Sequence, residues 1–78
     1  MKRKKASATS RRLFGDAVRH RRLQFAVSQE KLAEAVGCHR NYLGRIERGE
    51  QNITLDMMVR VAKALRCSVT DIVREAAL

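Results

Sequence analysis

The clearest structural pattern in the chain is the segment SQEKLAEAVGCHRNYLGRIERG, residues 28–49. It predicts two short helices joined by a tight turn. The hydroxyl of Ser28 can accept hydrogen bonds from the free N–H groups at the start of the first helix. Gly37 follows the last apolar residue of that helix, where positive φ is favoured. The second helix is predicted over residues 40–47 and is closed by Gly49; its exposed start suits insertion into the DNA major groove.

Apolar residues at helical spacing predict three further helices, over residues 11–25, over residues 55–66 and from about residue 68. The fold class is therefore expected to be all-α, with five helices of which the second and third form the helix-turn-helix. The expected caps of the other three helices are Thr9 or Ser10, Thr54, and Ser68 or Thr70. The predicted apolar positions are Phe14, Ala17, Val18, Phe25, Leu32, Ala33, Val36, Leu43, Ile46, Leu55, Met58, Val61, Ala62, Leu65, Val69, Ile72, Val73 and Ala76.

The charge of the 78 residues is large and uneven. The formal net charge is +9, and residues 1–53 carry 13 Lys and Arg against 5 Asp and Glu, whereas residues 54–78 carry 4 against 3. Positive charge gathers where the helix-turn-helix lies, as binding to double-stranded DNA requires, although charge alone also fits a solvated surface. Residues 1–10 are predicted to be a flexible basic arm, which either contacts DNA or is only a tail. Residues 11–78 are predicted to be the DNA-binding and dimerisation domain.

Other classes of protein have little support in the sequence. No apolar run could span a membrane and none follows the basic N-terminus as in a signal peptide, so we expect a cytoplasmic protein. Cys38 and Cys67 lack the spacing of a zinc site and are interpreted as packing residues, with redox sensing as the alternative. The chain has no glycine-rich phosphate loop and no nucleophile–base pair, so no enzyme, metal, cofactor or small-molecule ligand is expected.

Several motifs together carry a family resemblance. They are S-Q-E-x-L-A from Ser28, Gly37, I-E-R-G from Ile46, R-x-x-R from Arg19 and A-x-A-L from Ala62. Over roughly residues 13–73 the chain resembles the lambda-repressor-like (Xre-type) helix-turn-helix regulators. The resemblance implies a nucleoid-associated regulator of bacterial or phage origin. It further implies a homodimer that binds a pseudo-palindromic operator and represses or activates transcription.

A narrower resemblance lies in RNYLGRIERGEQNITL, residues 40–55, which is similar to the small restriction–modification controller proteins. The chain departs from the family pattern at Ala26 and Arg66, where Gly is common, and at Ile53, where Pro is common. The alternative function is an antitoxin or protein-interaction module that neutralises a toxin and regulates its own operon.

The candidate base-contacting residues lie at the start of the second helix of the motif. Arg40 and Arg45 can each donate two hydrogen bonds to guanine, and Asn41 can pair bidentately with adenine. The resemblance adds His39 to this set. His39 is alternatively the N-cap of that helix.

A second set of residues is predicted to contact phosphates. The helix N-terminus at Ser28 and Gln29 offers free N–H groups, and the resemblance implies that Gln29 also braces Arg40. Tyr42, Arg48 and Asn52 flank the helix and are expected to hold the DNA backbone, with partial burial as the alternative for Tyr42.

Three further assignments concern structure and protein partners. A buried arginine needs a partner, and the resemblance implies a structural ion pair between Arg22 and Glu47. Glu30 and Glu34 are either ordinary helix-stabilising residues or, by resemblance, a patch that contacts RNA polymerase. The predicted dimer interface consists of Val69, Ile72 and Val73, which alternatively only close the core of one protomer.

Overall fold

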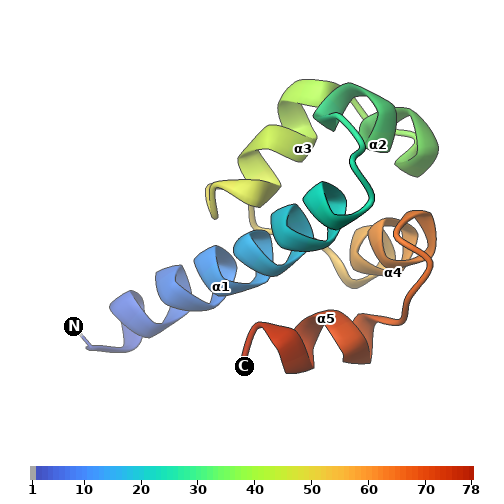
Figure 1. Cartoon of the computed structure of the whole chain (residues 1–78). Coiled ribbons are helices and arrows are strands. Elements are labelled where there is room, and N and C mark those ends of the chain that lie inside the picture. The colour runs from blue at the N-terminus through green and yellow to red at the C-terminus, as the bar shows by residue number, and fades with distance from the viewer. Residues whose placement is uncertain (1) are drawn as a thin grey trace.

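The computed structural model describes residues 2–78, with side chains from Ser10 onward. Its helices are α1 (Lys2–Gln24), α2 (Gln29–Val36), α3 (Arg40–Glu47), α4 (Leu55–Ala64) and α5 (Val69–Glu75) (Figure 1). No strand occurs between residues 2 and 78, which confirms the all-α prediction. Within the same residues, no helix is both long and apolar enough to cross a membrane.

The main helix contacts form a ring. Helix α1 contacts α3 and α5, α2 contacts α3 and α4, and α4 contacts α5. Figure 1 shows α2 and α3 on one side of α1, and α4 and α5 on the opposite side. One core therefore lies inside the ring, and α3 keeps a side that faces away from it.

The helices begin at the residues that the sequence predicts, except for α1. Ser28, Thr54 and Ser68 accept hydrogen bonds from the backbone N–H groups of the third residue of α2, α4 and α5. In α5 the cap is reciprocal, because the Asp71 carboxylate accepts from the Ser68 N–H at 3.0 Å. Each cap satisfies a donor that the helix itself leaves free.

The predicted start of the first helix at Arg11, capped by Thr9 or Ser10, is wrong, because α1 begins at Lys2. Residues 2–10 contain no Gly or Pro and are mostly Lys, Arg and Ala, which are strong helix formers. A packed helix that starts within residues 11–24 can therefore continue backwards through the charged run. Met1 and the side chains of residues 2–9 lie outside the described part, and the predicted role of the arm in DNA contact stays a prediction.

All five helices end in the same way. After each helix one residue takes positive φ, and the N–H of the next residue donates to a carbonyl five residues earlier, for example Cys67 to Ala62 O at 2.9 Å. This is the Schellman arrangement, which glycine favours. Three of the five positive-φ residues are not glycine, namely Ala26, Arg66 and Ala77.

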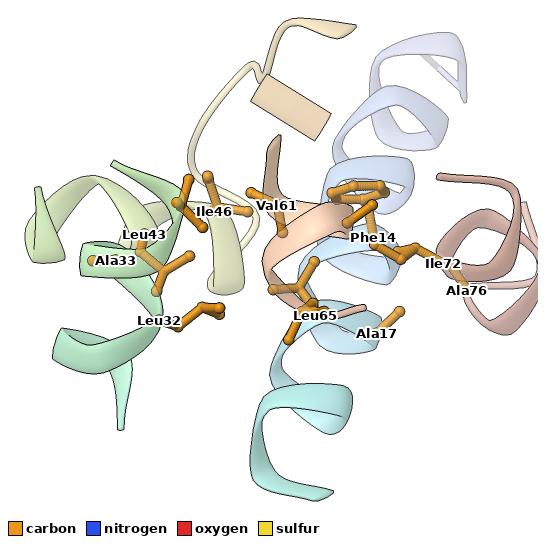
Figure 2. Close-up of a cluster of buried hydrophobic side chains, with 13 residues drawn as sticks. Phe14, Ala17, Leu32, Ala33, Leu43, Ile46, Val61, Leu65, Ile72 and Ala76 are labelled. Carbon is orange, nitrogen blue, oxygen red and sulfur yellow. The ribbon is translucent and has the colours of Figure 1, made fainter. Parts of the chain in front are cut away.

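The core draws side chains from every helix. Figure 2 shows Phe14 and Ala17 of α1 facing the cluster formed by the other helices. The largest side chains with no more than about one-fiftieth of their surface exposed are Leu43, Leu65, Ile72, Val18 and Val61. The alternation of apolar and polar residues along each helix is thus realised as one shared core.

Two residues predicted to be buried are exposed. Phe25 is 49% exposed, because it follows the last residue of α1 and the chain then reverses at Ala26. Leu55 is 65% exposed, because it is the first residue of α4 and its turn lies beyond the edge of the core. Helical periodicity assigns a face but does not show where contact with the neighbouring helix ends.

Helices α1 and α3 approach closely at Gly15, which is buried. A Cβ atom at this position would collide with the Ile46 carbonyl oxygen and would lie 2.7 Å from that of Glu47. The backbone of α1 therefore lies directly against the last turn of α3. This contact fixes the depth at which α3 sits on the domain.

Candidate nucleic-acid interface

Helix α3 is presented by α2 and the three-residue turn 37–39. Gly37 has φ of +85°, and the Cys38 N–H donates back to Ala33 O at 3.0 Å, so α2 stops and the chain turns at once. The core side of α3 carries Leu43 and Ile46, which are buried. The predicted base-contacting side chains, Arg40, Asn41 and Arg45, are all exposed on its other sides.

His39 is the N-cap of α3. Its Nδ1 atom accepts a hydrogen bond from the Asn41 N–H at 3.3 Å, and the side chain is exposed. Of the two roles considered for His39, the structure contains the cap. A neutral imidazole that accepts through Nδ1 carries its proton on Nε2, so a donor remains available at the start of α3. Its contact with a base stays a prediction.

A buried ion pair holds α3 to α1. The Arg22 guanidinium donates from Nε to Glu47 Oε2 at 2.6 Å and from Nη2 to Glu47 Oε1 at 3.0 Å. Its Nη1 donates to Val27 O at 2.9 Å. Arg22 is 7% exposed and Glu47 3% exposed, so the predicted structural pair is confirmed. Because both carboxylate oxygens are engaged, Glu47 is turned away from any DNA surface.

Gln29 adds a third donor to this pair. Its Nε2 donates to Glu47 Oε1 at 2.9 Å. The side chain thus connects the start of α2 to the end of α3, and the brace that it provides is to Glu47 rather than to Arg40 as expected. The phosphate contact of Gln29 stays a prediction, together with that of Ser28, whose hydroxyl oxygen caps α2 through the Lys31 N–H at 3.0 Å.

The other candidate phosphate contacts lie around α3. Arg48 and Asn52 are exposed, whereas Tyr42 is half-buried and packs against the core. The partial burial considered for Tyr42 is therefore what the structure contains. Arg48 has a partner that the sequence analysis did not identify, since its Nε lies 3.2 Å from Glu50 Oε1.

Two further arginines have roles that sequence reasoning missed. Arg60 of α4 donates to the carbonyl oxygens of Val36 and Gly37 at 3.0 Å each. Its positive charge thus lies at the C-terminal end of α2, where the helix dipole favours a cation. Arg21 and Glu75 form a bidentate pair between α1 and α5, with atoms 2.6 and 3.0 Å apart. No local motif identifies these partners, because they are distant in the sequence.

The predicted dimer residues divide into two groups. Ile72 is fully buried within the protomer, so its assignment to an interface between protomers is wrong. Val69 and Val73 are half-buried, and their assignment stays a prediction. Other exposed apolar side chains in this part of the chain are Leu55 (65%) and Val59 (39%) on α4, and Leu78 (52%) after α5.

The two cysteines are free thiols that pack partly against the core. Burial raises the pKa of the Cys38 thiol, although the charge of Arg60 lowers it. Burial likewise raises the pKa of the Cys67 thiol, with Arg21 opposing the effect. Both thiols are thereby held in the protonated form, which favours the packing interpretation. Among the described side chains, no three His, Cys, Asp or Glu residues gather to hold a metal ion.

Comparison with known proteins identifies the family. A model of the helix-turn-helix family HTH_3 matches residues 18–72, which span α2, α3 and α4, the last part of α1 and the first part of α5. The chain belongs to this helix-turn-helix family. The match includes the exposed side of α3 and the ion pair that holds it.

Among proteins with an assigned name, the chain is similar to two control proteins. It is 54% identical over 43 residues to control protein C.SmaI of Serratia marcescens, which covers 55% of this chain and 51% of that protein. It is 44% identical over 63 residues to control protein C.BamHI of Bacillus amyloliquefaciens, which covers 80% and 78%. The chain thus spans about half the length of C.SmaI and most of C.BamHI.

A solved structure with the same helix arrangement is that of the clp gene regulator ClgR from Corynebacterium glutamicum. It superposes with a TM-score of 0.85 at 35% sequence identity, covering 87% of each chain. The five-helix arrangement is therefore that of known gene regulators.

Proposed function

We propose that this protein is a transcriptional regulator that binds a pseudo-palindromic operator in duplex DNA as a homodimer, and that it controls a restriction–modification locus. The observation that carries the proposal is the exposed, basic start of α3, held to α1 by the buried Arg22–Glu47 pair. The similarity to C.SmaI and C.BamHI supports the assignment to the controllers.

Recognition divides into two tasks. Arg40 and Arg45 donate to guanine O6 and N7, and Asn41 pairs with adenine N6 and N7. His39 contacts a base edge through Nε2. Phosphates are held by the N-terminus of α2 at Ser28 and Gln29 and by residues around α3, namely Tyr42, Arg48 and Asn52.

The second protomer docks on the face formed by α4 and α5. Leu55, Val59, Val69 and Val73 offer apolar surface there, and a protomer of this size has little core of its own. Two recognition helices related by a two-fold axis then reach half-sites about 34 Å apart on one side of the duplex. Glu30 and Glu34, both exposed, face a bound RNA polymerase when the operator lies beside a promoter.

The test is selection of bound duplexes from a random pool at about 0.15 M salt, where non-specific binding is weak. We expect enrichment of an inverted repeat with a fixed spacing between its halves. Arg40→Ala should then cost about 1–3 kcal/mol on the selected site and relax the base preference there, whereas Arg48→Ala should weaken binding to selected and random DNA alike. A pool with no enriched sequence would contradict the proposal and favour a toxin-binding role.

A further inference from the structure

Arg48 is a predicted phosphate contact that pairs with an exposed acidic side chain, that of Glu50. Its Nε lies 3.2 Å from Glu50 Oε1, and the two side chains are 58% and 54% exposed. A DNA phosphate and the Glu50 carboxylate both offer charged oxygen atoms that accept hydrogen bonds from the Arg48 guanidinium. The two groups can therefore compete for it.

The Arg48 guanidinium lies back along the recognition helix. A Cβ atom at Gly44, one turn earlier on α3, would come within 3.1 Å of Arg48 Nη1. Gly44 thus leaves a slot on the surface of α3, and the guanidinium occupies it. Arg40, Gly44 and Arg48 are spaced four residues apart and share one face of the helix, so the guanidinium lies on the face that also carries Arg40.

The position of Glu50 is set by a rigid turn. Its N–H donates to Arg45 O at 2.8 Å, which ties it to the last turn of α3. Before it, Gly49 has φ of +74°, and a Cβ atom there would lie 2.7 Å from the Arg12 Cα atom of α1. Because α1 supports the turn from behind, the carboxylate stays beside Arg48.

From this geometry we infer that Glu50 is a positioning residue that competes with DNA phosphate for Arg48 and so restrains binding to DNA of any sequence. In the free protein the carboxylate cancels the charge of Arg48 and holds it in the Gly44 slot. A phosphate gains Arg48 only when it displaces Glu50 from the guanidinium. The inference rests on the proposed function, since it concerns the same DNA surface.

The experiment measures binding of a random-sequence duplex by the full chain at several salt concentrations. For Glu50→Gln we expect binding about fivefold tighter at low salt, the effect of one unit charge facing another about 4 Å away across water. The slope of log K against log salt should become more negative by about 0.9, because one more cation becomes free to release a counterion.

The matched control is Glu75→Gln. This substitution makes the same change in net charge and also frees an arginine, Arg21, but at the contact between α1 and α5. It should leave the salt slope near that of the wild type. Circular dichroism of each variant checks that the helices are retained.

A second arm places Glu50→Gln in a chain that also carries Arg48→Ala. If Glu50 acts through Arg48, its removal changes neither affinity nor slope in that background. Equal effects of Glu50→Gln and Glu75→Gln, a persistent effect without Arg48, or weaker binding by Glu50→Gln would each overturn the inference. A wild-type chain that binds no DNA at all would instead refute the proposed function.

Discussion

Replacement of the Arg22–Glu47 pair provides the strongest test of how α3 is held. In Glu47→Leu, the Arg22 guanidinium loses both charged hydrogen bonds and retains only that to Val27 O, while Gln29 loses its acceptor. Removing one member of a buried pair costs about 3–5 kcal/mol, because the other charge stays buried without its partner. A chain of 78 residues is expected to have a free energy of unfolding of about 4–12 kcal/mol. The single variant should therefore lose a large part of its free energy of unfolding, and a chain at the lower end of that range would be close to unfolded.

The double variant Arg22→Met with Glu47→Leu should behave differently. Both charges are gone, and apolar side chains of similar length fill the space between α1 and α3. Such replacements are often neutral or stabilising by about 1–4 kcal/mol. We therefore expect the double variant to unfold near the wild-type urea concentration, although each single variant is severely destabilised.

The assay is urea unfolding followed by helix circular dichroism, at one protomer concentration for all chains because dimerisation itself adds stability. The coupling energy between the two sites should be several kcal/mol, far above the roughly 0.5 kcal/mol seen for independent sites. If the losses of the single variants simply add in the double variant, the pair does not act as one buried unit and the reasoning fails.

Three further predictions concern backbone conformation and charge. Ala26→Gly and Arg66→Gly should each raise the free energy of unfolding by up to about 1 kcal/mol, because positive φ costs a residue with a Cβ atom more than it costs glycine; a lower urea midpoint would contradict this. Gly15→Ala should lower stability by about 1–3 kcal/mol, although helix propensity alone predicts a gain, because the new Cβ meets the Ile46 carbonyl; a higher melting temperature would show that α1 and α3 move apart freely. The hydrogen bond from the Ser68 backbone N–H lowers the pKa of Asp71. Its ionised form therefore stabilises the folded chain above the ordinary carboxyl pKa of about 4, and this contribution is lost as the pH falls through the lowered value. In Asp71→Ala, the stability difference from the wild type should shrink on acidification, and a difference that is the same at pH 7 and pH 3 would refute this origin.

The parts of the fold that the sequence predicted are those with local causes. Ser28, Thr54 and Ser68 each cap the helix that follows them, and Gly37 ends α2, because these effects act within a few residues. The start of α1 was missed for a related reason. Taken by itself, the charged run of residues 2–10 favours disorder. It is also rich in helix formers and adjacent to a packed helix, which can extend through it.

The parts that could not be predicted depend on the packing of distant segments. The partners of Arg60 and Arg21 lie 24 and 54 residues away, so no motif connects them. Periodicity placed Ile72 on an apolar face but could not tell whether that face meets the protomer's own core or a second copy. Glu50 was overlooked because acidic residues near a predicted DNA surface carry no recognised contact of their own.

The positive-φ residue that follows each of the five helices also affects which substitutions the chain can accept during evolution. Ala26 and Arg66 have positive φ, and both side chains are exposed. Positive φ is therefore the restriction at these two positions, and many residues can be accepted there at a small cost in stability. At Gly49 the surroundings add a second restriction, because a Cβ atom would lie 2.7 Å from the Arg12 backbone. At Gly37 a Cβ atom would come within 2.8 Å of the Arg60 guanidinium, and moving that group would disturb its hydrogen bonds to the end of α2. Mutations should therefore accumulate at positions 26 and 66 and be purged at positions 37 and 49. The two glycines lie on either side of α3, so the scaffold around this helix is expected to change more slowly than the exposed side chains that are proposed to contact DNA bases.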